Sequence, residues 1–126
     1  MKIILLLVLF GTSAHAAELT FKLDSGKSVK MTELRERTLL LNSSCVKNSE
    51  PSDCKAWKLA QVSSATGIHP QGGQEPGALV CAKLGGRVQI AKDSRNNEEA
   101  FCGFSDGSLI SCGSLYAIAL KNSLKP

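Results

Sequence analysis

Histidine and aromatic side chains are scarce in this sequence, which holds two histidines, one tryptophan and one tyrosine. His15 falls in the N-terminal segment, so His69 is the one imidazole in the rest of the chain. A Cys–His nucleophilic pair needs its imidazole beside a thiolate of low pKa, whereas His69 lies in a stretch rich in Gly, Pro and Gln. The sequence therefore argues against a thiol enzyme, and we expect no catalytic residues.

Closely spaced metal ligands and blocks of like charge are also missing. Structural zinc sites usually place two cysteines about two to four residues apart, but the closest pair here, Cys45 and Cys54, is nine residues apart. The net charge is +4, with Lys and Arg scattered among Asp and Glu, whereas nucleic-acid-binding domains gather their basic residues in a patch. We expect no metal, no cofactor and no nucleic-acid partner.

Only one apolar run is long enough to suggest targeting. Residues 3–10 are all apolar, follow Lys2 and precede Ala14-His15-Ala16, which is the order of a secretion signal with cleavage after Ala16. A membrane-spanning helix needs about 20 apolar residues, so this run favours a signal peptide over an anchor. We expect residues 1–16 to be removed and the mature chain to be periplasmic or secreted, without a transmembrane segment.

Five cysteines follow this site: Cys45, Cys54, Cys81, Cys102 and Cys112. Thiols pair in an oxidising compartment, so we expect two disulfides and one left-over thiol, either free or joining two chains in a dimer. Sequence alone does not fix the pairing. The first choice is Cys45–Cys54, because these residues bracket a short polar loop and its closure would stabilise the fold by roughly 2–3 kcal/mol.

The N-terminal part, residues 17–63, begins with an amphipathic pattern. Alternating apolar residues at 19–23 and 29–31 around the turn at 24–27 predict a β-hairpin. Thr32 is expected to cap a helix that continues through residues 39–41. A second helical stripe at 56–62 places Trp57 in the core, and residues 64–76 are predicted to form a loop or linker.

The C-terminal part, residues 77–121, is expected to form a helix, a hairpin and a helix. Pro76 suits a first helical turn, and Gly85-Gly86 suits a helix end. Strands are predicted at 87–92 and 99–104, a turn at 105–108, a last helix from Leu115, and a frayed tail at 122–126. The expected fold class is a small disulfide-stapled α+β domain with short antiparallel hairpins and short helices.

The segments "GALVCAKLGGRVQI", "AFCGFSDGS" and "SLY" resemble the small bacterial exported domain of unknown function 333, which is often labelled a haemolysin. The resemblance implies structural roles for the motif residues Gly85, Gly86, Asp106, Gly107 and Ser108. Family members carry a cysteine very soon after the Asp-Gly-Ser turn and another at the end of the last helix. Here Cys112 comes four residues after Ser108 and no cysteine follows it, so the resemblance leaves one of Cys81, Cys102 and Cys112 as the spare thiol.

The sequence indicates no pair of carboxylates suited to acid–base catalysis. Glu98 and Glu99 are adjacent, so in a strand their side chains point to opposite faces. Asp106 is explained by a turn, where its side chain can bond the following backbone amides.

Three functional hypotheses remain. The first is an exported non-enzymatic module that binds an unknown protein or an envelope component. The second is a secreted inhibitor of a hydrolase, with residues 49–53 or 67–76 as its reactive segment. The third is a haemolysin-like membrane-perturbing factor. Lysis by a small protein usually needs a strongly amphipathic basic helix, and the closing helix at 115–121 is short and lightly charged.

Overall fold

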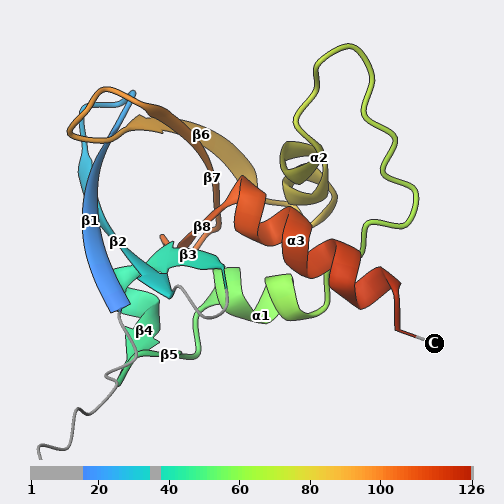
Figure 1. Ribbon diagram of the computed structural model, residues 1–126, viewed down its shortest axis with the longest axis horizontal. Helices are drawn as coiled ribbons and strands as arrows, with labels where there is room; N and C mark the ends of the chain where they lie inside the picture. Colours follow the sequence, from blue (N-terminus) through green and yellow to red (C-terminus); the bar gives the residue numbers. More distant parts are fainter. Residues whose placement is uncertain (1–15, 35–37, 126) are drawn as a thin grey trace, which may run out of the picture.

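A computed structural model describes residues 16–34 and 38–125. Six antiparallel strands form a closed barrel in the order β1-β2-β3-β8-β7-β6, which Figure 1 shows end-on. The signal-peptide prediction falls on residues that lie outside the described ones, except for Ala16. The strands are β1 (Ala16–Leu23), β2 (Ser28–Leu34), β3 (Leu39–Asn42), β6 (Arg87–Lys92), β7 (Glu98–Gly103) and β8 (Leu109–Ser111).

The helices lie together on one side of this barrel (Figure 1). They are α1 (Lys55–Gln61), α2 (Pro76–Lys83) and α3 (Cys112–Ser123). A short 3-10 turn, η2 (Ser43–Cys45), leads into a small separate hairpin formed by β4 (Val46–Lys47) and β5 (Glu50–Pro51). The α+β class is therefore confirmed, whereas the closed barrel was not predicted.

Several local predictions are confirmed. β1 and β2 form the expected hairpin, with seven antiparallel residue pairs. α2 begins at Pro76, and Gly85 beyond its end has a φ of +79°, the left-handed conformation that ends many helices. β6 and β7 pair over residues 87–92 and 98–103. The two parts on either side of the loop at 64–76 close one barrel, since β1 pairs with β6 and β3 pairs with β8.

The helix predicted from Thr32 through residues 39–41 is wrong. Thr32 lies in β2, where its Oγ1 is 2.9 Å from Ser43 Oγ, and the three leucines form β3. Leu39 and Leu41 pack among the helices, while Leu40 packs against the core inside the barrel. A strand buried on both faces has a continuous apolar run and no alternation, which is why the sequence resembled a helix here.

The last helix starts three residues earlier than predicted. α3 begins at Cys112, and Ser111 Oγ accepts a hydrogen bond of 3.1 Å from the Ser114 amide. This is an N-cap, in which a side-chain oxygen satisfies an amide of the first helical turn. The preceding residues 109–111 form β8, a strand too short for its own periodic signal.

Two cores share the strands β3, β7 and β8. The first fills the barrel and contains Phe21, Leu23, Met31, Ala91, Phe101 and Leu109. The second lies between the barrel and the helices and includes Leu41, Val80, Cys102, Ile110 and Leu115. Side chains alternate between the two along a strand, as Phe101 and Cys102 do in β7. Trp57 packs against the second core and is half-buried.

Candidate functional site

The side chains that face the inside of the barrel change from apolar to acidic at one end of it. In β2, Glu33 lies two residues beyond the buried Met31 and therefore on the same face. In β7, Glu99 stands in the same relation to Phe101. Both glutamates are half-buried. The barrel therefore has an apolar interior and two carboxylates at its mouth.

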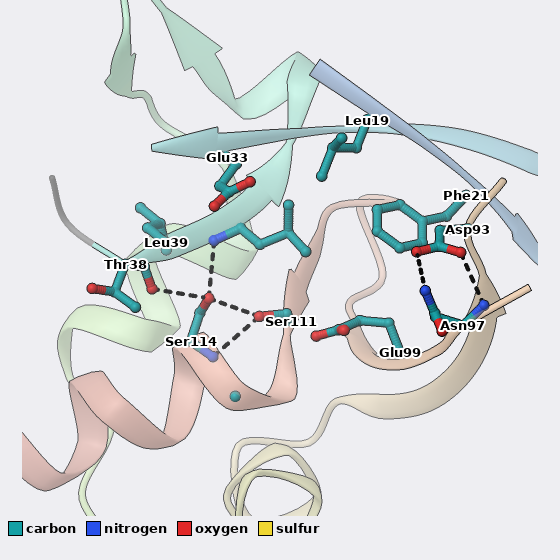
Figure 2. Close-up of a pocket in the computed structure, with 12 residues that line it drawn as sticks. Leu19, Phe21, Glu33, Thr38, Leu39, Asp93, Asn97, Glu99, Ser111 and Ser114 are labelled. Carbon is teal, nitrogen blue, oxygen red and sulfur yellow. Dashed lines mark hydrogen bonds between the residues drawn. The ribbon is translucent and has the colours of Figure 1, made fainter. Parts of the chain in front are cut away.

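A cavity of about 430 Å³ opens at this mouth. That volume falls within the range usual for ligand pockets, roughly 300–1,000 Å³. Figure 2 shows Glu33 and Glu99 directed into the same space from opposite sides. We call this cavity the barrel mouth; its lining residues are Leu19, Phe21, Glu33, Thr38, Leu39, Leu40, Asp93, Asn97, Glu99, Ser111, Gly113 and Ser114.

Ser114 fixes one wall of the mouth by joining β3 to the first turn of α3. Its Oγ accepts hydrogen bonds from the Leu40 amide at 2.9 Å and from Ser111 Oγ at 2.7 Å, and it donates to the Thr38 carbonyl at 3.3 Å (Figure 2). β3 and β8 share one residue pair, Leu41 with Ile110. The serine thus supplies a bond that the short strand pairing leaves unmade.

Asn42 strengthens the same junction. Its Oδ1 accepts a hydrogen bond of 3.0 Å from the Leu109 amide, and its Nδ2 donates to the Lys30 carbonyl at 3.5 Å. Together with Ser114, this side chain connects β2, β3, β8 and α3. The wall of the mouth is therefore held by side chains as well as by backbone pairing.

The opposite wall is the turn between β6 and β7. Asp93 accepts hydrogen bonds of 2.9 Å from the amides of Asn97 and Arg95 and one of 3.3 Å from Asn97 Nδ2. These bonds, with the Asn97 amide the largest contribution, hold the pKa of Asp93 below its ordinary value. Asp93 is therefore a charged and fixed carboxylate beside the mouth.

Glu99 and Glu75 are affected in the opposite direction. Burial, followed by the charge of Asp93, raises the pKa of Glu99. Burial and then the charge of Glu99 raise the pKa of Glu75, which immediately precedes α2. A carboxylate that is partly removed from water beside other carboxylates is less stable in its charged form. The charged form of Glu99 is therefore less stable in the mouth than in water.

Cys112 is the free cysteine among the three left open by the family resemblance. It is 0% exposed, and burial, followed by the charges of Glu75 and Glu99, raises the pKa of its thiol to about 12. At neutral pH it is an unreactive thiol. A disulfide to a second chain would require the start of α3 to open first, so burial argues against the dimer that the odd cysteine had suggested.

The two disulfides join Cys45 with Cys54, as predicted, and Cys81 with Cys102. The second bridge ties α2 to β7, and the motif residue Gly86 lies against it. A Cβ atom at Gly86 would overlap the sulfur atoms of both cysteines. Gly85 and Gly86 therefore act differently, one through its left-handed backbone and the other through its lack of a side chain.

The Asp-Gly-Ser motif does more than turn the chain between β7 and β8. Asp106 Oδ2 accepts a hydrogen bond of 2.8 Å from the Lys55 amide, and Ser108 Oγ accepts one of 2.8 Å from the Ala56 amide. These amides begin α1, where free N–H groups need acceptors. Gly107 has a φ of +83° and makes the turn itself. The motif caps a helix about 50 residues away in sequence, a role that local sequence patterns could not reveal.

Other sequence candidates lie outside the mouth. His69 is exposed in the loop between α1 and α2, and Glu98 is exposed on the opposite face of β7 from Glu99. In the described residues, no three His, Cys, Asp or Glu side chains are placed to hold one metal ion. Glu33 and Glu99 were not predicted as a pair, although each lies two residues from an apolar residue, Met31 or Phe101, and so on the same face of its strand.

Comparisons with protein-family models, curated proteins and solved structures gave no match to this chain. The family resemblance therefore stays a prediction. None of the helices in the described residues has the length and apolar character of a membrane span.

Proposed function

We propose that this chain is an exported, non-enzymatic binding module that takes a macromolecular partner at the barrel mouth. The observation that carries the proposal is the mouth itself, a cavity of about 430 Å³ with an apolar floor and inward-facing carboxylates. Apolar pockets with a few convergent polar groups are typical of binding sites. The two disulfides support export, because such bridges persist in oxidising compartments.

The state of the thiol supports a non-enzymatic role. Cys112 is buried, and its pKa of about 12 keeps it protonated at neutral pH. A nucleophilic cysteine needs the thiolate and access to substrate. If the purified mature protein hydrolysed peptides or envelope polymers and lost that activity in Glu99→Gln, the non-enzymatic part of the proposal would fail.

Two substitutions at equally exposed apolar residues, one inside the mouth and one outside it, test the binding site. Leu19 lines the mouth and is 39% exposed, while Val88 on β6 lies outside it and is 38% exposed. Immobilised mature protein is used to capture partners from envelope and secreted fractions. We expect the wild type and Val88→Glu to capture the same partner, and Leu19→Glu to lose it. Equal capture by both variants would place the site elsewhere.

A second candidate, an inhibitor of a hydrolase, is supported by the loop between α1 and α2. Residues 69–75 are all exposed, and the loop extends away from the helices in Figure 1. One end is fixed, because Ser123 Oγ accepts from the Ala65 amide at 2.8 Å and Lys83 Nζ donates to the Thr66 carbonyl at 2.9 Å. The other end enters α2 at Pro76. Fixing the ends of an exposed loop reduces the conformational entropy that it loses on binding.

Replacing residues 70–74 with a Gly-Ser linker tests this candidate. Inhibition of a protease or lysozyme that disappears in the loop variant, but persists in Leu19→Glu, would favour it over binding at the mouth. A wild-type protein that inhibits no hydrolase in such a panel would exclude it.

A further inference from the structure

The barrel is incompletely paired where β1 meets β6. β1 pairs with β2 over residues 16–22, but with β6 only at Lys22 and Leu23. Beyond Lys92 the chain leaves β6 and enters the β6–β7 turn, which is closed by a hydrogen bond of 3.0 Å from the Asp93 amide to the Asn97 carbonyl. Residues 17–21 of β1 therefore have a strand on one side only among the described residues. We call this segment the open edge.

A second cavity, of about 560 Å³, lies along the open edge. It is bounded by residues 18–20 of β1 on one side and by the β6–β7 turn on the other. It shares Leu19, Asp93 and Asn97 with the barrel mouth, so the two cavities are adjacent. An added strand would lie about 4.8 Å from β1, on the side where this space opens.

The charges of the two cavities differ. Among the described residues that line the mouth there is no Lys, Arg or His, whereas Glu33, Asp93 and Glu99 do line it. The outer cavity shares Asp93, but it also contains Arg95, and its Glu18 lies 3.8 Å from Lys30 in an ion pair. A positive side chain is therefore more complementary to the inner space than to the outer one. An apolar stem on that side chain would suit Leu19 and Phe21 beside it.

From this geometry we infer that the open edge binds an extended polypeptide segment as an added strand, which places one lysine or arginine side chain in the barrel mouth between Glu33 and Glu99. An exposed strand edge offers unpaired N–H and C=O groups, and pairing with them gives affinity while pockets for alternate side chains give specificity. The inference rests on the proposed function and names the chemistry of its partner.

Other occupants predict different behaviour. A second copy of β1 at the same edge would make the protein dimerise. A small amine would use the carboxylates without the backbone of β1. The experiment therefore uses probes that separate the side-chain contribution from the backbone contribution.

The probes are blocked nine-residue peptides of alternating threonine and valine with lysine, norleucine or glutamate at the centre. They are titrated into the ¹⁵N-labelled, oxidised mature chain, and the amide shifts of residues 17–21 report binding. We expect the lysine peptide to bind at least about tenfold more tightly than the glutamate peptide. Glu99→Gln should reduce that preference several-fold. Glu98→Gln, which removes the same charge from the opposite face, should leave it unchanged.

Two N-methylated lysine peptides, offset by one residue, test the strand pairing. Only alternate amides of a strand face a given neighbour, so one methylated peptide should lose about tenfold in affinity and the other should retain it. Strand addition is overturned if both methylated peptides bind as tightly as the unmethylated lysine peptide. It is also overturned if butylammonium alone competes for the site as well as unlabelled lysine peptide does. The third contradicting result is that no peptide binds and the protein dimerises. Leu19-dependent partner capture would survive any of these results, so the failure of this inference is distinguishable from failure of the proposed function.

Discussion

The two faces of β7 and β8 contact very different regions of the molecule. Toward the helices, Cys102 and Ile110 are completely buried in a core that includes residues of all three helices. Toward the barrel, Phe101 and Leu109 are buried, but the next residues on that face, Glu99 and Ser111, line an open cavity. The same strands therefore contribute stability on one face and a candidate binding site on the other.

The covalent links are concentrated on the helical side. Both disulfides contact that core. The barrel interior depends on apolar packing, including an edge-to-face contact between Phe21 and Phe101 with ring centroids 5.0 Å apart. Both cross-links therefore contact the core on the helical side, while the barrel interior holds none of the bridged cysteines.

The largest expected effect comes from removing the bridge between α2 and β7. Cys81→Ala with Cys102→Ala should lower the free energy of unfolding by about 3 kcal/mol, because the bridge closes a loop with a sequence separation of 21. Urea denaturation measures this value. A loss below about 1 kcal/mol would show that the helical side does not depend on its cross-link.

Ser114→Ala should have the next largest effect. It leaves the Leu40 amide without its acceptor, and a buried unsatisfied donor costs about 1–3 kcal/mol. Gly113→Ala is a suitable control, since a Cβ at Gly113 would contact nothing within 4 Å. Denaturation curves of the two variants should therefore differ clearly. Equal stability would mean that β3 is not held through α3.

Asp106→Asn tests the cap on α1 and its dependence on pH. Although partial burial opposes the shift, hydrogen bonds from Ser108 and the Lys55 amide lower the pKa of Asp106. A lowered pKa gives stability that is present above the ordinary value of 3.8 and is lost as pH falls through the folded value. We expect the wild type to exceed the variant by about 1 kcal/mol at pH 7, and this difference to shrink below about pH 4. A difference independent of pH would contradict the charged cap.

Glu99→Gln should have the smallest effect on stability, and it should stabilise the protein where the other substitutions destabilise it. Because the folded pKa of Glu99 is raised, its contribution to stability is lost as pH rises through that value. The variant should therefore melt roughly 1–3 °C higher than the wild type at pH 7 and at the same temperature at pH 4. Glu98→Gln, exposed on the other face, should show no such change. A lower melting temperature for Glu99→Gln at pH 7 would contradict the electrostatic description of the mouth.

Sequence reasoning succeeded where the signal was local. The β1–β2 hairpin, the end of α2 at Gly85 and the Cys45–Cys54 bridge follow from alternation, glycine conformation and short loop closure. It failed at β3, whose leucines face two cores at once. It also missed the barrel, because strand closure depends on contacts between residues far apart in sequence, such as Leu41 with Ile110.

The candidate site was harder to predict for the same reason. Glu33 and Glu99 come from different halves of the chain and line one cavity only because β1–β3 and β6–β8 close one barrel. Asp106 and Ser108 were explained as turn residues, whereas their side chains also cap α1. The local part of each role was predictable, and the long-range part required the structure.

The central claim is that the helical side is the more stable region and that the open edge lies in the less stable one. Native-state amide hydrogen exchange tests this claim most directly. Amides of the β1–β2 hairpin should exchange through local opening, at free energies at least about 2 kcal/mol below those of Ile110 and Leu115. Equal free energies in both regions would contradict the claim, because they would show that the barrel and the helical core open only together.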